Sequence, residues 1–139
     1  MQIREIMTTQ VDFAGPETTL RDLATRMRDE DVGAVPIAEN DRLVGMVTDR
    51  DIVVRGVAGK SPVDDLTARE VMTERLLWCF DNQNVEDVLG NMSRQQIRRL
   101  PVVDTEKRLV GMVSLGDLSQ HADTATTGEA LKGISAHAS

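Results

Sequence analysis

Cysteine, aromatic side chains and long apolar runs are all scarce in this 139-residue sequence. Because Cys79 is the only cysteine, no disulfide can form within the chain. No uninterrupted apolar run approaches the roughly 20 residues that a membrane-spanning helix needs. Tyrosine is absent, and the aromatic residues are limited to Phe13, Trp78 and Phe80. The sequence therefore predicts a globular protein with an aliphatic core and no internal disulfide.

The formal net charge is −7, which argues against a nucleic-acid or anionic-membrane partner, since both need a basic surface. The first residues lack the charged-then-apolar pattern of a secretory signal, so a cytoplasmic location is expected. Catalysis is also disfavoured. The two histidines, His121 and His137, and the single cysteine offer little for nucleophilic chemistry or for a metal site, and no Walker-type loop is present.

What the sequence does contain is a repeat. Motifs return in the same order: Arg4–Thr8 as Arg69–Thr73, Val35–Ile37 as Leu100–Val102, and Arg42–Thr48 as Arg108–Ser114. A unit of about 60 residues buries too little surface to be stable alone, so the two copies are expected to pack together. We predict a first repeat over residues 1–58, a linker over 59–67, a second repeat over 68–122, and a tail over 123–139. A short helix is expected over Thr127–Ser135.

Each repeat is predicted to follow the order β-α-β-β-α after a short helical segment that carries a Met-Thr pair, so the fold class is mixed α/β (α+β). We call this segment, Arg4–Thr8 in the first repeat and Arg69–Thr73 in the second, the lead-in. In the first repeat we expect strands at 10–13, 34–38 and 43–47, a helix capped by Thr19, and a last helix from Asp49 or Arg50. In the second repeat we expect strands at 76–80, 100–103 and 109–113, a helix capped by Asn84, and a last helix from Leu115 or Gly116.

The sharpest local signal lies where a strand ends and a helix begins. Gly45–Asp51 and Gly111–Asp117 both follow the pattern G-h-h-[T/S]-x-x-D, in which h is apolar. One interpretation is a helix capping box, in which the hydroxyl and the carboxylate each bond a free backbone N–H. The other is a ligand site. Unpaired N–H groups at a helix start suit a phosphate, and a carboxylate one turn later can accept hydrogen bonds from the hydroxyls of a ribose.

Two β-α-β-β-α copies that carry these motifs resemble the cystathionine-β-synthase (CBS) domain pair, or Bateman module. The similarity covers Ile3 to about Ala122 and is greatest to small stand-alone bacterial pairs, a group that includes a mycobacterial hypoxic-response protein. The resemblance implies two copies related by pseudo-twofold symmetry, with clefts for adenosyl compounds such as AMP, ADP, ATP, NAD or S-adenosylmethionine. It assigns the ribose to Asp51 and Asp117, and the first phosphate to Thr48 and Ser114.

The two motifs have unequal surroundings. Arg98 and Arg99 precede Pro101 in the second repeat, whereas Gly33 and Ala34 stand there in the first. Since a guanidinium suits bidentate phosphate contacts, we expect a phosphate-rich ligand near Arg98, Arg99, Ser114 and Asp117. A solvated or dimer-facing arginine pair is the alternative. Arg50, which can offset the charge of Asp49, and the two prolines Pro36 and Pro101 are further candidate ligand-binding residues.

The sequence leaves three candidate functions for this protein. The first is a ligand-sensing CBS pair that needs no cofactor, forms a homodimer through its helices and signals to a separate effector protein. The second is a structural or protein-interaction module that binds no nucleotide. The third is a redox-responsive or metal-responsive dimer that acts through Cys79 and His121.

Overall fold

The computed structural model describes residues 1–73 and 77–122. The helix expected over Thr127–Ser135 and the first residue of the strand expected at 76–80 lie outside the described residues. The chain divides into two compact units. Unit 1 consists of Met1–Val11 together with the chain from Leu77 onward, and unit 2 consists of Asp12–Leu76.

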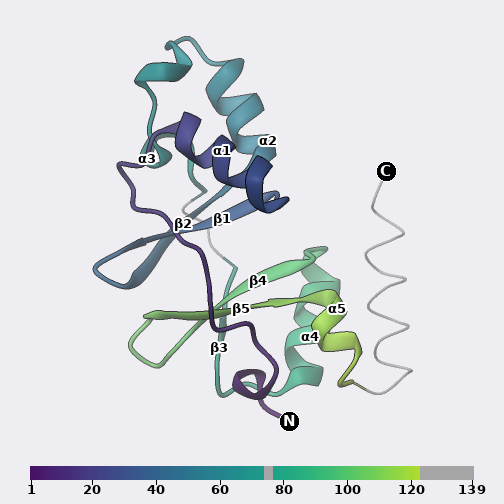
Figure 1. Ribbon diagram of the computed structural model, residues 1–139. Coiled ribbons are helices and arrows are strands. Elements are labelled where there is room, and N and C mark those ends of the chain that lie inside the picture. Colours follow the sequence, from purple (N-terminus) through teal and green to yellow (C-terminus); the bar gives the residue numbers. More distant parts are fainter. Residues whose placement is uncertain (74–76, 123–139) are drawn as a thin grey trace. The chain divides into compact units, whose positions relative to one another are not determined.

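Unit 2 is built on an antiparallel hairpin of β1 (Ala34–Glu39) and β2 (Arg42–Thr48), preceded by α1 (Leu20–Glu30) (Figure 1). The one-turn helix α2 (Asp49–Asp51) follows β2 directly and continues as a π-helical segment, η2 (Ile52–Val57). The unit ends with η3 (Val63–Asp65) and α3 (Ala68–Val71).

Unit 1 contains a three-stranded sheet in the order β3-β4-β5. The strands β3 (Cys79–Phe80) and β4 (Arg99–Val103) are parallel, and β4 is antiparallel to β5 (Leu109–Ser114). The helices are η1 (Ile3–Glu5), α4 (Val85–Gln95) and α5 (Leu115–Ser119). Figure 1 shows the purple N-terminal segment beside this sheet, far in sequence from the strands that it accompanies.

Each unit therefore combines most of one repeat with the lead-in segment of the other. In unit 1, Thr8 and Met112 exchange backbone hydrogen bonds at 2.9 and 3.0 Å. In unit 2, Thr73 and Met46 do the same at 2.9 and 3.2 Å. The sequence repeat predicted most of the elements, but it did not predict that each lead-in would pair with the strand that belongs to the other copy.

Each unit has its own hydrophobic core, and within the described residues no aromatic side chain is buried, as the composition predicted. In unit 1 the core includes Ile3, Val88, Leu89, Met92 and Leu118, all fully buried. In unit 2 it joins α1 and the hairpin to α3. Helix α1 buries Leu20, Leu23 and Met27, and helix α4 buries their counterparts, which confirms the amphipathic periodicity. The stripe is narrower on α1, where Ala24 is exposed in the place of the buried Leu89.

The first strand of the first repeat, expected at Gln10–Phe13, is wrong. Unit 2 has there only a single parallel bridge between Ala14 and Ile37. The equivalent segment of unit 1 continues its ladder, because Asp81 N–H donates to Val103 O at 2.9 Å. The residue in the place of Asp81 is Pro16, which has no N–H to donate, so the pairing stops.

The helix caps are confirmed in position and differ in chemistry. Thr19 Oγ1 accepts a hydrogen bond from Asp22 N at 3.2 Å, as predicted. Asn84 occupies the N-cap of α4, but its side chain makes no capping bond. The first N–H of that helix, Val85 N–H, donates instead to Met1 O at 3.0 Å. The N-terminal segment thus satisfies the first N–H of the helix, whereas the Asn84 side chain was expected to accept from an N–H one or two residues later.

The glycine of each G-h-h-[T/S]-x-x-D motif lies against a lead-in methionine. A Cβ atom added to Gly45 would lie 2.5 Å from Met72 Sδ, and one added to Gly111 would lie 2.6 Å from Met7 Sδ. The Gly111 position is tighter, because Thr8 O is also only 2.9 Å away. The Met-Thr pair and the motif glycine recur together in both repeats because the lead-in methionine packs directly on the glycine.

We expect Gly111→Ala to lower the free energy of unfolding by about 2–3 kcal/mol, at the upper end of overpacking costs. Gly45→Ala should cost only about 1 kcal/mol, because the flexible Met72 side chain can move aside, whereas the Thr8 carbonyl belongs to a paired backbone. Urea denaturation of both variants measures the difference. A loss at Gly45 equal to that at Gly111 would contradict this account.

Cys79 is buried in the unit 1 core, and burial raises the pKa of its thiol to about 12. The unfolded thiol ionises near pH 8.5, so the native state holds a proton that the unfolded state releases at higher pH. This contribution is complete below about pH 8.5 and is lost as the pH rises toward 12. Between pH 8 and 10 the wild-type protein should therefore lose about 1–2 kcal/mol more stability than Cys79→Ala. Parallel pH slopes for the two proteins in urea denaturation would refute the prediction.

Candidate functional site at two strand-to-helix junctions

The junction of unit 2 lies between β2 and α2. Thr48 Oγ1 accepts a hydrogen bond from Asp51 N at 3.1 Å, and Thr48 N–H donates to Asp51 Oδ2 at 2.9 Å. Both bonds are partly buried. The two side chains thus satisfy each other's backbone donors in a complete capping box.

The junction of unit 1 repeats this geometry between β5 and α5. Ser114 Oγ accepts from Asp117 N at 3.1 Å, and Ser114 N–H donates to Asp117 Oδ2 at 3.2 Å. The capping interpretation is therefore confirmed at both motifs. It holds Asp51 and Asp117 in the same orientation relative to the strand that precedes each helix.

Capping uses only part of each carboxylate. Both boxes engage Oδ2, and no described residue donates a hydrogen bond to Oδ1 of Asp51 or Asp117. An ionised carboxylate accepts on both oxygens, so capping leaves Oδ1 available to a hydroxyl pair. Both aspartates are only half-buried, which leaves this oxygen within reach of a small molecule.

The backbone beside the two junctions is the same, but the side chains are not. In unit 2, Asp49 N–H donates to Gly33 O at 2.9 Å. The Asp49 carboxylate lies 3.3 Å from the place that a Cβ of Gly33 would occupy, and it accepts from Arg50 N–H at 2.8 Å. An arginine at position 33 would thus meet a carboxylate already held by its own helix turn.

In unit 1 the equivalent bond runs from Leu115 N–H to Arg98 O at 2.8 Å, with Leu115 buried. Arg99 is paired with Ser114 across β4 and β5. The structure therefore brings Arg98 and Arg99 next to the unit 1 junction along the backbone, as expected. Both guanidinium groups are exposed, and neither has an ion pair with a described carboxylate. The unit 1 junction therefore has two positively charged side chains beside it, whereas the unit 2 junction carries the negatively charged Asp49.

The remaining predicted site residues take different places. Arg50 is exposed on α2, beside Asp49. Pro36 and Pro101 are buried in β1 and β4, where they face Met46 and Met112 across each hairpin. Since those methionines pair with the lead-in threonines, the prolines lie one strand away from Thr8 and Thr73. Their assignment to a ligand site stays a prediction.

Sequence reasoning missed Thr8 and Thr73 as neighbours of the junction strands. The signal was present, since the Met-Thr pair recurs together with the glycine motif, but the repeat alone does not tell which copy pairs with which.

The residues of the redox and metal hypothesis do not come together. In the described part of the chain no group of three or more metal-binding side chains is present. Cys79 is buried in the core, whereas His121 is exposed after α5. His137 lies outside the described residues. None of the helices in the described ranges is both long enough and apolar enough to cross a bilayer.

Comparison with known sequences assigns the repeats to a family. The CBS domain model matches residues 3–57 and 68–123. The chain is 41% identical over 138 residues to the CBS domain-containing protein YhcV of Bacillus subtilis, covering 96% of this chain and 94% of that protein. It is 40% identical over 119 residues to Hypoxic response protein 1 of Mycobacterium tuberculosis, covering 85% and 82% of the two chains.

Solved structures share the fold. The crystal structure of Hypoxic Response Protein I, which contains two coordinated zinc ions, matches with a TM-score of 0.79 and 38% identity over 88% of this chain and 99% of that one. The CBS domain pair of protein MJ0100, in complex with 5′-methylthioadenosine and S-adenosylmethionine, matches with a TM-score of 0.72 and 26% identity over 86% and 94%. On the family match, the doubled motifs and the shared fold, this chain belongs to the CBS domain family and carries a tandem pair of CBS domains.

Proposed function

We propose that this protein is a regulatory sensor that binds an adenosyl compound and passes the signal to a separate effector protein. The class of ligand comprises AMP, ADP, ATP, NAD and S-adenosylmethionine. The observation that carries the proposal is the pair of junction aspartates. Each is held rigidly by a capping box through Oδ2, and each keeps Oδ1 available to a sugar diol.

The proposal gains support from a relative with the same fold. The MJ0100 domain pair binds 5′-methylthioadenosine and S-adenosylmethionine, two ligands that share a ribose and an adenine. In this chain Asp51 and Asp117 would hold the ribose, while Thr48 and Ser114 would lie near the first phosphate or its replacement. No cofactor is needed, and the role is regulatory rather than catalytic.

A phosphorylated ligand fits the junction of unit 1 better than that of unit 2. Arg98 and Arg99 supply two exposed guanidinium groups there, and guanidinium forms strong paired hydrogen bonds with phosphate. In unit 2 the Asp49 carboxylate would repel a phosphate at the same relative position. The ligand would act by favouring one of two conformations of the pair, in proportion to its difference in affinity for them.

A protein-interaction module without a ligand is the alternative. Its supporting observation is that both junctions form complete capping boxes without any ligand.

Ligand binding is tested by thermal denaturation with AMP, ATP, NAD, 5′-methylthioadenosine and S-adenosylmethionine. A ligand at about 100 times its dissociation constant adds about 2.7 kcal/mol of stability, which raises Tm by several degrees. We expect Asp117→Asn to abolish the phosphorylated-ligand shift, because the amide can still accept the Ser114 N–H bond but loses the charge that holds a diol.

The matched control is Asp22→Asn, which changes the third residue of another capped helix outside both junctions. It should leave the ligand-induced shift intact. If none of the compounds raises Tm, the sensor proposal fails and the interaction module remains.

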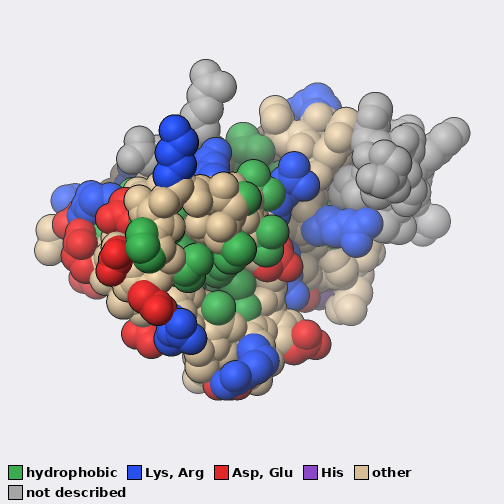
Figure 2. Space-filling model, turned by 90° about the horizontal axis from the view of Figure 1, so that it is seen from above, with side chains coloured by type: hydrophobic (Ala, Val, Ile, Leu, Met, Phe, Trp, Pro, Cys, Tyr) green, Lys and Arg blue, Asp and Glu red, His purple; other side chains and the backbone are tan. Residues whose placement is uncertain are grey.

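We further propose that the protein forms a homodimer through the helical face of unit 2. Three valines of η2 are strongly exposed: Val53 at 58%, Val54 at 50% and Val57 at 61%. They adjoin a groove of about 370 Å³ between α1 and η2, lined by apolar residues such as Leu20, Ile52 and Val63. Figure 2 shows hydrophobic side chains gathered on this side among charged ones, and such a patch favours burial against a second copy.

We expect Val54→Asp to convert the dimer to a monomer, because it places a charge in the apolar interface, whereas Val54→Thr keeps the shape and should weaken the dimer far less. Analytical ultracentrifugation measures both variants. A wild-type protein that is monomeric at tens of micromolar, or a Val54→Asp dimer, would contradict the proposal.

A further inference from the structure

The last helical segment of the first repeat, η2, has π-helical backbone bonding. Ala58 N–H donates to Val53 O at 3.0 Å, five residues back, whereas an α-helix bonds four residues back. The corresponding stretch of the second repeat is α-helical, since Ala122 N–H donates to Leu118 O, four residues back, at 3.0 Å. The last turn of this repeated unit therefore occurs in two different registers within one chain.

A glycine allows the π register in unit 2. Gly56 is buried, and a Cβ atom there would lie 2.7 Å from Leu20 Cδ1 of α1. The wider π turn can therefore lie close to α1 only because position 56 has no side chain. Ala122 stands in the place of Gly56 in the second repeat, and His121 stands in the place of Arg55.

Arg55 of η2 reaches the carbonyl end of α3, within the second lead-in. Its Nη1 donates to Val71 O at 3.4 Å and to Met72 O at 3.5 Å. The last carbonyls of a helix lack partners within the helix and readily accept from an arginine. Both bonds are long, so each is weak and can be broken and remade. Next along the lead-in is Thr73, whose backbone pairs with β2.

Asp51 offers Arg55 an alternative partner. It lies four residues before Arg55, the spacing at which a carboxylate pairs with a following guanidinium on an α-helix. No described residue forms an ion pair with Asp51, and the capping box leaves its Oδ1 available. Because a π turn contains one more residue than an α turn, a change of register rotates Arg55 about the helix axis.

We propose that η2 is a two-state switch. In the π form Arg55 holds the second lead-in, and in the α form Arg55 turns to Asp51 and the lead-in is no longer held. A hydroxyl bound at Asp51 Oδ1 competes with Arg55 for the carboxylate and so favours the π form, a step that rests on the proposed function. Since the chain passes from this lead-in into unit 1, the switch links the unit 2 junction to the segment that joins the units.

The experiment measures amide hydrogen exchange by NMR at Thr73 and Met46, whose N–H groups hold the second lead-in on β2. Thr8 and Met112 form the same pair in unit 1, where no arginine takes the place of Arg55, and are the internal control. We expect Arg55→Met to speed exchange at Thr73 and Met46 by about three- to tenfold, as for one typical hydrogen bond, and to leave the control pair unchanged. Arg55→Lys keeps the charge and should have a smaller effect.

The sign of the effect of Asp51→Asn distinguishes a switch from a cap. Loss of a purely structural cap would speed exchange in unit 2. The switch predicts that exchange at Thr73 and Met46 slows by about twofold, because asparagine no longer pairs with Arg55 in the α form. The slowing should vanish in Arg55→Met/Asp51→Asn.

The register of η2 is measured by the scalar coupling across the hydrogen bond of Ala58 N–H. In the wild-type protein this coupling should join Ala58 to Val53, as in the structure. Arg55→Met should move it toward Val54, four residues back. A coupling that stays on Val53 would overturn the change of register.

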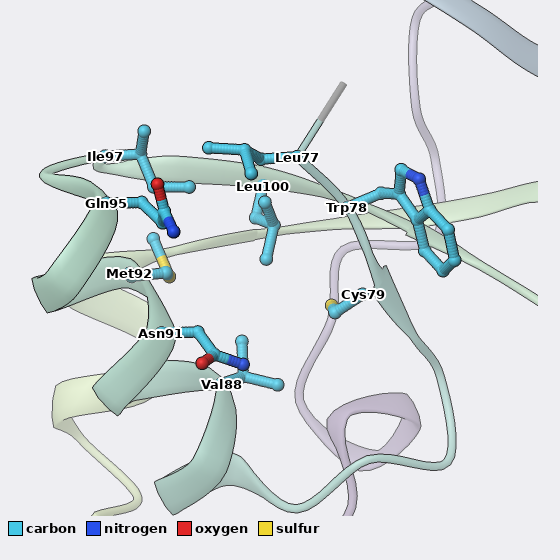
Figure 3. A pocket seen from close by; sticks show the side chains of 9 residues that line it. All are labelled: Leu77, Trp78, Cys79, Val88, Asn91, Met92, Gln95, Ile97 and Leu100. Carbon is cyan, nitrogen blue, oxygen red and sulfur yellow. The ribbon is translucent and has the colours of Figure 1, made fainter. Parts of the chain in front are cut away.

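Trp78, the single tryptophan, reports whether unit 1 stays folded in each variant. It packs edge-on against Phe80 with ring centroids 4.8 Å apart, and Figure 3 shows its side chain beside a cavity lined by residues such as Leu77, Asn91 and Gln95. Its fluorescence should be the same in all variants. A changed spectrum would show that the substitutions disturb the whole fold, which would overturn a local switch.

Titration with 5′-methylthioadenosine separates this proposal from the sensor proposal. We expect the compound to slow exchange at Thr73 in Asp117→Asn, where only the unit 2 junction keeps its aspartate. If it raises the Tm of that variant without slowing exchange, the switch fails and the sensor stands. If Asp51→Asn slows exchange through Arg55 but no adenosyl compound raises Tm, the switch stands and the sensor fails. Unchanged or faster exchange in Asp51→Asn, or a slowing that persists without Arg55, overturns the switch.

Discussion

The contact between a lead-in methionine and a strand glycine underlies the rest of the structure. In each unit, Met7 or Met72 lies against the bare backbone of Gly111 or Gly45, so closely that a single added carbon would overlap the sulfur. Backbone hydrogen bonds between the adjacent threonine and the junction strand hold the segment in place. Because each lead-in comes from the other repeat, neither repeat contains all of its own core, and the two copies depend on each other to fold.

This contact also orders the candidate site. The glycine, the lead-in and the capping box belong to one short stretch of strand, β2 or β5, so the backbone that accepts the lead-in ends in the Thr48 or Ser114 cap. The cap then sets the direction of Asp51 or Asp117. In each aspartate, Oδ2 completes the capping box, and Oδ1 stays available to accept a hydrogen bond from a ligand. For this reason capping and ligand binding are not competing uses of the motif.

The repeated backbone carries unequal side chains. Hydrogen bonds at equivalent places, Asp49 to Gly33 and Leu115 to Arg98, keep the two junctions alike in geometry. The substitutions around them place Arg98 beside one junction and Gly33 with the Asp49 carboxylate beside the other. Since backbone bonds do not depend on side-chain identity, duplication can preserve the frame while each copy acquires a separate chemistry.

The sequence by itself determined the two copies, their helices and most of their strands, because apolar periodicity and capping residues act locally along the chain. It also predicted both capping boxes, since T/S-x-x-D is a local pattern. It did not show that the strand expected at Gln10–Phe13 would be reduced to a single bridge, although Pro16 is visible, because the loss of one donor matters only once the partner strand is known. Only the tertiary structure decided that each lead-in joins the other copy and that Leu77, Asn91 and Gln95 surround a cavity. Those contacts link residues far apart in sequence, and no local pattern encodes which of two similar partners a segment will meet.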